Sequence, residues 1–414
     1  CNGEEIDSMR HIFRFFLIGV LTSMQTAYAQ VSITQSTFEG RESYTLKNSQ
    51  MRITMLTGGA YIAELRFLSP EGTESVNPML VPHYRTIDPH QYTPEKHQHL
   101  YGLGRNAKLM AGYMGHYLCF PYFGGGITED EEELGYSTHG EAYTVKYEIE
   151  EKIQDAGASV TASATLPMSE YAVSRTLTLM SGQSVVLVEE TIENLEDFKR
   201  PYHYVQHVTF GKPFIVFGKT LIDAPVTRIA NSADKGDPAN LNTLQWPMVS
   251  TTAGVQTNAG VFGSAKGEGL YRAWFMDPER AYTWFTMYNP DQNLLVGYIF
   301  SREQNPWIGD WQENQRSQVM PRSGKTVAWG LEVGTTPFGS GVSSIEQDPV
   351  FDTETYRLIG AKQRKKQSYL IFLLEIDKDF KGVGELKLEE GAINLVEIDH
   401  LNQIRIAHDF PLPK

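Results

Sequence analysis

Residues 143–192 read YTVKYEIEEKIQDAGASVTASATLPMSEYAVSRTLTLMSGQSVVLVEETI, and this stretch decides the fold. Apolar and polar side chains alternate along it, as they do on a β-strand whose successive residues point to opposite faces. Turn-forming residues interrupt the alternation at 155–157 (Asp-Ala-Gly) and 181–182 (Ser-Gly). The stretch therefore predicts consecutive antiparallel strands at 143–150, 158–166, 171–179 and 184–192.

The rest of the chain continues this pattern of short strands. Further candidates are 50–56, 281–288, 294–301, 326–333, 368–376, 384–388 and 393–398. Short helical turns are expected at 95–100 and 104–110, and the acidic run 129–133 is expected to be a solvated loop or, alternatively, a cation site. Many short strands over a long chain predict a mainly β protein built as a large antiparallel β-sandwich. We expect it to span residues 30–348, with 349–414 adding strands to the same sandwich; the alternative for 349–414 is a small appended β unit.

Composition limits the class of ligand. The 414 residues carry 36 Lys and Arg against 50 Asp and Glu, for a net charge of -14. Nucleic acids and anionic membrane surfaces require a basic protein face, so we expect neither as a partner. A neutral or weakly charged ligand such as a sugar or oligosaccharide fits better, and no cofactor or metal is predicted.

Residues 9–30 have the features of a secretory signal. Arg10 and Arg14 give a basic start, Phe15–Leu21 is apolar, and Ala27-Tyr28-Ala29 is a small-x-small cleavage site. The apolar run is too short to cross a bilayer, and no later stretch qualifies, so no membrane span is expected. The alternative is a buried N-terminal helix. We predict that residues 1–29 are removed and that the protein is secreted or periplasmic.

The two cysteines, Cys1 and Cys119, do not form a disulfide framework. Cys1 precedes the predicted signal and would be absent from the mature protein. Cys119 lies in the apolar run Tyr117-Leu118-Cys119-Phe120-Pro121, which predicts a buried, unreactive thiol.

The first region with potential chemistry is 119–141, CFPYFGGGITEDEEELGYSTHGE. An aromatic run containing Pro and Gly is followed, after a polar loop, by His139-Gly140. An imidazole at this position is suited to binding a polar ligand, or it simply caps a turn before the next strand.

The second region is 193–214, where a polar turn precedes a strand with histidines. His203 and His207 are four residues apart, so on one strand they point to the same face and line one site together. Two alternatives remain for this pair: a metal site, which needs a third ligand, and a pair of buried core histidines.

The third region, 298–338, supplies three glutamates and two tryptophans. A carboxylate is a natural general base at neutral pH, so Glu303, Glu313 and Glu332 are the candidates for that role. Trp307 and Trp311 are suited to stacking on a sugar, although two core tryptophans are equally consistent with the sequence. Gly309-Asp310 between them favours a surface loop.

Two further features lie upstream. Arg105, in Tyr101-Gly102-Leu103-Gly104-Arg105-Asn106, is a candidate for binding sugar hydroxyls, and the Gly-x-Gly is not interpreted as a phosphate loop. His83, His90, His97 and His99 lie within one polar stretch. They predict an exposed loop, or a transition-metal site if three of them converge.

Taken in order, these motifs resemble those of the aldose 1-epimerase (galactose mutarotase-like) superfamily over roughly residues 45–340. The resemblance implies a large β-sandwich and acid-base interconversion of sugar anomers. It implies His207 as the general acid and His139 and Arg105 as sugar-binding residues. The family's base is a late glutamate: Glu303 fits best by order and spacing, while Glu332 in Gly330-Leu331-Glu332-Val333-Gly334-Thr335-Thr336-Pro337 matches the local motif but follows the Pro-Gly turn.

Two other functions remain open on the same fold, because a fold alone does not specify an activity. One is carbohydrate binding without catalysis. The other is cleavage of glycans by a lyase or hydrolase, for which Trp307 and Trp311 would line a wide groove.

Overall fold

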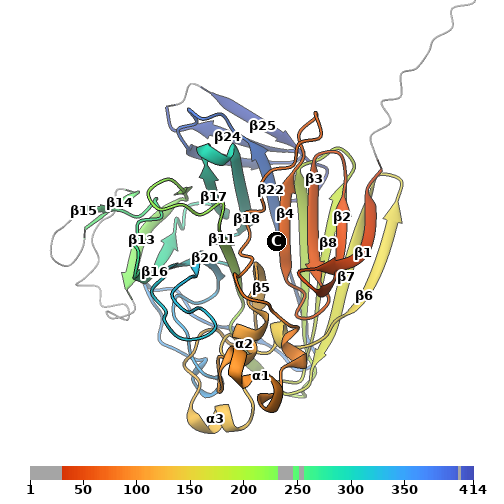
Figure 1. The fold of residues 1–414 in the computed structure, drawn as a ribbon, viewed down its shortest axis with the longest axis vertical. Coiled ribbons are helices and arrows are strands. Elements are labelled where there is room, and N and C mark those ends of the chain that lie inside the picture. Colours follow the sequence, from red (N-terminus) through yellow and green to blue (C-terminus); the bar gives the residue numbers. More distant parts are fainter. Residues whose placement is uncertain (1–29, 232–245, 251–255, 400–401) are drawn as a thin grey trace, which may run out of the picture.

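The computed structural model describes residues 30–231, 246–250, 256–399 and 402–414. The predicted signal segment, residues 1–29, lies outside the described residues. Two large antiparallel sheets dominate the described part of the chain, one of ten strands and one of eight. The predicted fold class, a mainly β protein built as an antiparallel sandwich, is confirmed (Figure 1).

The ten-stranded sheet positions the candidate site. Its order is β1 (Ser32–Phe38), β2 (Arg41–Lys47), β3 (Met51–Leu56), β4 (Ile62–Phe67), β5 (His116–Cys119), β11 (Val205–Gly211), β20 (Val327–Gly334), β19 (Trp307–Asn314), β16 (Glu268–Met276) and β13 (Val226–Asn231). Strands β5, β11, β20 and β19 therefore lie side by side in the middle of the sheet although they are far apart in sequence.

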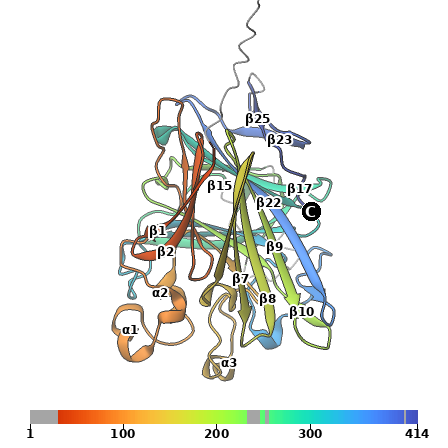
Figure 2. The ribbon, with the colours of Figure 1, turned by 90° about the vertical axis from the view of Figure 1, so that its right-hand side faces the viewer.

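The eight-stranded sheet forms the second layer. Its order is β12 (Leu221–Asp223), β17 (Tyr282–Asn289), β18 (Leu294–Ser301), β22 (Arg364–Glu375), β9 (Val185–Asn194), β8 (Tyr171–Met180), β7 (Gly157–Leu166) and β6 (Glu148–Gln154). Figure 2 shows β7, β8, β9 and β22 as neighbours in this layer, on the side away from the first two helices.

The main core lies between the two sheets. Along β8 every second residue is buried, which places Val173, Leu177 and Leu179 against residues such as Ile53 and Leu331 of the ten-stranded sheet. This is the alternation that the sequence showed, and burial of the apolar set fixes the register of each strand.

The outer face of the ten-stranded sheet is also covered. Strand β11 is buried along its whole length, because Val208 and Phe210 enter the core between the sheets while Val205 enters a second cluster with Tyr117 and Leu109. This face is covered by two stretches of chain, one between β4 and β5 and one between β5 and β6. They hold helices α1 (Pro94–Tyr101), α2 (Ala107–Gly112) and α3 (Glu129–Glu133), together with the short 3-10 turns η1 (Pro89–Gln91) and η2 (Ala142–Thr144). Figure 1 shows the three helices gathered at one end of the molecule.

Smaller elements complete the described chain. Strands β23 (Val383–Glu389), β24 (Ala392–Glu397) and β25 (Gln403–Ala407) form a three-stranded sheet, whereas β22, which belongs to the same C-terminal stretch, lies inside the eight-stranded sheet. Two-stranded sheets pair β10 (Arg200–Tyr202) with β21 (Arg357–Ile359) and β14 (Met248–Ser250) with β15 (Gln256–Asn258). The remaining 3-10 turns are η4 (Pro290–Gln292) and η5 (Val342–Ser344).

Two local predictions were wrong. The strand predicted at 143–150 begins only at Glu148, because Tyr143 and Tyr147 are buried and donate hydrogen bonds to the carbonyls of Thr138 (2.7 Å) and Ala142 (2.9 Å) instead of extending a ladder. The acidic run 129–133 is helix α3 rather than a loop, since a capping box at Thr128 satisfies its first backbone N–H groups.

One other expectation agrees with the structure. Cys119 is a free, buried thiol, and burial raises its pKa well above the usual value. No helix in the described ranges combines the length and apolar character needed to cross a membrane.

Candidate functional site

A row of side chains crosses the middle of the ten-stranded sheet on its outer face. In the strand register, Tyr117 on β5 is opposite His207 on β11, His207 is opposite Glu332 on β20, and Glu332 is opposite Gly309 on β19. Residues directly opposite each other on antiparallel strands bring their side chains into contact. His207 Nε2 accordingly lies 3.0 Å from Glu332 Oε1.

Gly309 leaves the space that the Glu332 carboxylate occupies. A Cβ at position 309 would lie 2.7 Å from Glu332 Oε2 and 2.8 Å from the hydroxyl of Tyr271. That hydroxyl donates to the carbonyl of Pro337 at 2.6 Å, and burial followed by the Glu332 charge raises the pKa of Tyr271 well above its usual value. Glu332 Oε2 is buried beside this hydroxyl and makes no hydrogen bond of normal geometry with a described residue.

The second ring nitrogen of His207 is held by Thr209, two residues along the same strand. His207 Nδ1 lies 2.9 Å from Thr209 Oγ1, and the Tyr113 hydroxyl is 3.4 Å from the same oxygen. Tyr117 stacks on the imidazole with ring centroids 4.7 Å apart and an interplanar angle of 15°. Both nitrogens therefore have partners, and the ring orientation is fixed.

His139 enters the same space from the segment that covers the sheet. Its ring centroid is 5.2 Å from that of His207. Its Nδ1 accepts the backbone N–H of Gly124 at 3.2 Å, which leaves Nε2 as the proton-bearing nitrogen of the neutral ring. Burial, and then the charges of His207 and Arg322, hold the pKa of His139 well below its usual value, so the ring is a neutral hydrogen-bond donor.

The backbone at His139-Gly140 explains why the two residues occur as a pair. His139 has φ +69°, a conformation that costs energy for a residue other than glycine and that concentrates at functional sites. Gly140 has φ +88°, and a Cβ there would lie 2.3 Å from the carbonyl oxygen of Phe120. The chain can thus cross close over Phe120 and present the imidazole to the sheet.

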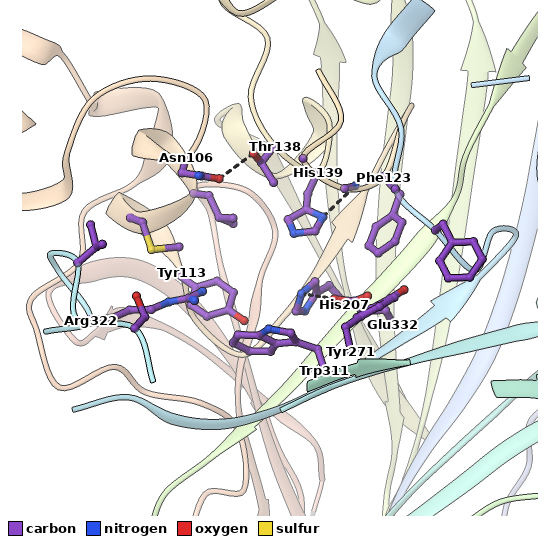
Figure 3. A pocket seen from close by; sticks show the side chains of 18 of the residues that line it. Asn106, Tyr113, Phe123, Thr138, His139, His207, Tyr271, Trp311, Arg322 and Glu332 are labelled. Atoms are coloured by element: carbon purple, nitrogen blue, oxygen red, sulfur yellow. Dashed lines mark hydrogen bonds and ion pairs between the residues drawn. The ribbon is translucent and has the colours of Figure 1, made fainter. Parts of the chain in front are cut away.

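His139, His207, Tyr271 and Glu332 line a cleft of about 1170 Å³ on the outer face of the sheet (Figure 3). Trp311, on β19, lies on one side of His207 in Figure 3, and Phe123 lies near His139. The guanidinium of Arg322 lies 5.0 Å from the ring centroid of Trp311 and 5.5 Å from that of Tyr113. The cleft therefore offers aromatic faces beside a buried acid-base pair.

The structure brings four of the residues predicted from sequence into this cleft: His139, His207, Trp311 and Glu332. It places the other five elsewhere: Arg105, His203, Glu303, Trp307 and Glu313.

Neither Glu303 nor Glu313 can pair with His207. Glu303 is an exposed residue in the turn after β18, and its backbone carbonyl accepts from Arg357 at 3.2 Å. Glu313 Oε1 accepts the backbone N–H groups of Arg316 (2.6 Å) and Ser317 (2.9 Å), so this carboxylate shapes the loop after β19. Of the three candidate glutamates, Glu332 is the one beside an imidazole.

His203 does not share a face with His207, which corrects the alternation expected for them. The chain is not a strand at His203 and Tyr204, so the period of two starts only at Val205. His203 Nε2 lies 3.1 Å from the carbonyl of Ile345, and burial lowers the pKa of His203 to about 4. It is a core histidine that holds a loop.

Trp307 and Arg105 also have structural partners. Trp307 is fully buried against Phe275, with ring centroids 4.8 Å apart, and both tryptophans lie on strand β19 rather than on a surface loop. Arg105 donates to Glu132 at 2.8 Å and to the carbonyls of Gly125 and Ile127. Its guanidinium ties the glycine-rich loop to helix α3 instead of facing the cleft.

The histidine-rich stretch does not assemble a ligand set. His97 Nδ1 accepts the backbone N–H of Thr93 at 3.0 Å, and the His83 ring packs edge-on against Tyr84. Within the residues that the structure describes, no three His, Cys, Asp or Glu side chains converge as metal ligands do.

Several site residues were not predicted from sequence. Tyr113, Thr209, Tyr271 and Arg322 became visible only in the structure. Thr209 could have been found, since it lies two residues after His207 and thus on the same face of its strand. Tyr271 and Arg322 gave no local signal, because their role depends on which strands and loops become neighbours.

Comparisons with known proteins agree with this architecture. No family model matches the sequence, and no curated protein matches it. Among solved structures, a candidate aldose 1-epimerase from Klebsiella pneumoniae is 14% identical over 84% of this chain and 83% of its own, with a TM-score of 0.60. A galactose mutarotase-like protein from Clostridium acetobutylicum is 11% identical over 84% of this chain and 99% of its own, with a TM-score of 0.52.

A candidate mutarotase from Salmonella typhimurium is 10% identical over 83% of this chain and 94% of its own, with a TM-score of 0.50. This chain therefore has the galactose mutarotase-like fold. The resemblance that the order of motifs suggested is confirmed at the level of the fold.

Proposed function

We propose that the chain is an aldose 1-epimerase-like enzyme that opens and recloses the ring of a sugar, with His207 as the acid and Glu332 as the base. The observation that carries this proposal is the 3.0 Å contact between His207 Nε2 and Glu332 Oε1 in an aromatic cleft. The two oxygens that exchange protons in mutarotation are both bonded to the anomeric carbon. An acid and a base that act on them must therefore be close neighbours, as these two groups are.

The reaction follows from these positions. Glu332 takes the proton of the anomeric hydroxyl, the bond between C1 and the ring oxygen breaks as the C1 carbonyl forms, and the His207 imidazolium protonates the ring oxygen. The open aldehyde then turns about C1–C2, and the reverse steps close the ring on its other face. Protons and electrons balance, and no other bond of the sugar changes. The sugar's two oxygens replace the contact that His207 and Glu332 make with each other.

The charges of the cleft favour a neutral sugar. Arg322 is the one Lys or Arg among the described residues that line it, whereas Glu332, Glu346 and Asp348 contribute three carboxylates. A phosphosugar would place its dianion among these carboxylates and would need more cations than one. This supports an unphosphorylated aldose.

His139 and Trp311 supply the binding contacts in this proposal. The neutral His139 ring donates from Nε2 to a sugar oxygen, because its Nδ1 already accepts from Gly124. The indole of Trp311 offers an apolar face to the C–H groups of a pyranose. Neither residue needs to change its charge during the reaction.

The activity is tested by polarimetry on freshly dissolved α-anomers of a panel of free aldoses. We expect the wild-type protein to accelerate equilibration of at least one aldose, and the Glu332→Gln variant to be slower by about 10²- to 10⁴-fold, the usual contribution of a positioned acid or base. Glu303→Gln is the matched control, since Glu303 lies outside the cleft. If no aldose equilibrates faster than in buffer, the proposal is wrong.

One observation favours carbohydrate binding without catalysis as a second candidate. His207 and Glu332 are each other's partners, and their side chains are only 3% and 5% exposed. If this contact stays closed when a sugar binds, the two groups cannot exchange protons with the sugar. Binding of sugar by calorimetry, without acceleration of equilibration for any aldose, would establish this alternative; release of shorter fragments from a glycan would instead indicate a lyase or hydrolase.

We further propose that the protein acts outside the cytoplasm, on the basis of the predicted secretory signal in residues 9–30. Expression of the full chain in a bacterial host and N-terminal sequencing of the exported protein test this proposal. A mature N-terminus at Gln30 supports it, whereas an intact N-terminus on cytoplasmic protein contradicts it.

A further inference from the structure

The cleft is much larger than the ring on which His207 and Glu332 would act. Its volume is about 1170 Å³. A hexopyranose has twelve non-hydrogen atoms, so even at the roughly 30 Å³ that each water occupies in the liquid it fills at most about 360 Å³. About two-thirds of the cleft therefore remains beyond a single sugar ring.

The inner and outer parts of the cleft differ in character. The inner part holds the half-buried His139 and the buried His207 and Glu332. The outer part is formed by loops and carries large apolar side chains that face solvent: Leu103 is 63% exposed, Val319 75% and Met320 52%. Leu103 lies between two glycines with φ near +80°, Gly102 and Gly104, at the bend that follows α1. A single exposed apolar residue needs no explanation, but three that line one cleft indicate a ligand surface.

The loop after η5 adds polar groups to the same outer part. Glu346, Gln347 and Asp348 line the cleft and supply side-chain oxygens that can accept hydrogen bonds from hydroxyl groups. Their two carboxylates disfavour glycans that carry uronic acid or sulfate groups. Apolar side chains for C–H faces together with acceptors for hydroxyls match the chemistry of a neutral saccharide.

The proposed reaction fixes the direction in which such a ligand lies. Ring opening requires a free anomeric hydroxyl, which a sugar residue loses when its C1 is joined to another. The ring at His207 and Glu332 must therefore be the reducing-end residue, and further residues, joined through its other hydroxyls, extend past Leu103 and Val319. We infer that the preferred substrate is the reducing end of a neutral oligosaccharide and that a free monosaccharide is a poorer one; this inference rests on the proposed function.

The experiment compares an aldose with the disaccharide and trisaccharide that end in the same aldose. Anomer exchange is measured by NMR saturation transfer at several concentrations. We expect kcat/KM to rise at least about tenfold from the monosaccharide to the trisaccharide. We expect Val319→Ser to remove most of that gain while leaving the rate for the monosaccharide unchanged. Leu134→Ser is the matched control, because Leu134 is 72% exposed but does not line the cleft.

Equal kcat/KM values for all three sugars would overturn the inference without affecting the proposed function. An equal effect of Val319→Ser and Leu134→Ser would overturn it as well. If no sugar undergoes exchange, the proposed function fails. Calorimetric titration with the same three sugars then tests separately whether the cleft binds an oligosaccharide. Tighter binding of the trisaccharide, weakened by Val319→Ser, supports an oligosaccharide ligand; equal binding of all three, or none, overturns it.

Discussion

Replacing Gly309 by alanine should disturb the Glu332 carboxylate without changing any polar group of the site. The added Cβ would lie 2.7 Å from Glu332 Oε2, 2.8 Å from the Tyr271 hydroxyl and 3.0 Å from Glu332 Cβ. Ordinary van der Waals contacts begin near 3.4 Å, so the carboxylate must move by about 0.7 Å. Overpacking of this kind costs about 1–3 kcal/mol of unfolding free energy. A misplacement near 1 Å in a reacting group costs about 10²-fold in rate.

Urea denaturation gives the change in unfolding free energy, and saturation transfer gives the rate of anomer exchange. Gly263→Ala is the matched control, since the nearest atom to a Cβ at Gly263 is 3.6 Å away. We expect Gly263→Ala to resemble the wild type in both measurements and Gly309→Ala to lose both stability and exchange rate. A Gly309→Ala protein with unchanged stability and rate would refute the argument that this glycine makes room for Glu332.

Three other predictions follow from particular contacts. Thr209→Val removes the hydroxyl that lies 2.9 Å from Nδ1 of the buried His207 and should cost about 1–3 kcal/mol in urea denaturation; an unchanged midpoint would contradict it. Burial raises the pKa of Asp223 to about 7, against roughly 3.9 in an unfolded chain, so the folded state holds this proton more tightly and stability falls as pH rises from about 4 to about 7. Asp223→Asn keeps an acceptor for the backbone N–H of Val383 (2.7 Å). It should match the stability of the wild type near pH 4 but be more stable by up to about 4 kcal/mol at pH 8. The same difference in melting temperature between the two proteins at both pH values would argue against this prediction. Arg322→Met removes the cation over Trp311 and should weaken sugar binding measured by tryptophan fluorescence. Because Arg322 Nη1 also lies 3.8 Å from Oε2 of the buried Glu313, the melting temperature should fall as well; unchanged affinity would show that Arg322 does not contact the ligand.

The strands were largely predictable because alternation is a local property of the sequence. The segments 171–179 and 294–301 correspond closely to β8 and β18. The start of β6 was not predictable in the same way. Tyr143 and Tyr147 continue the apolar alternation, but their side chains enter buried clusters where no ladder forms.

The candidate site was predictable only in part. His139 and His207 were found through motifs that lie within short segments. The choice among three glutamates depends on which strand pairs with β11, and the register that places Glu332 opposite His207 joins segments far apart in sequence. A strand pattern shows which face a residue takes but not which strand becomes its neighbour.

Trp307 and Trp311 illustrate the same limit. They lie four residues apart on one face of β19, yet Trp307 meets Phe275 in the core and Trp311 meets the cleft. Their different surroundings come from the loops that cover the two ends of the strand. Sequence alternation places both on the same face and cannot separate a core residue from a ligand platform.

The central claim is that His207 and Glu332 act together on one anomeric centre. Its most direct test is the anomer exchange rate, by saturation transfer, of the wild type, His207→Asn, Glu332→Gln and the double variant. Each single variant should lose at least about 10²-fold, and the double variant should lose no more than the slower single one, because both groups serve one ring-opening step. A single variant with the wild-type rate, or losses that multiply in the double variant, would contradict the claim.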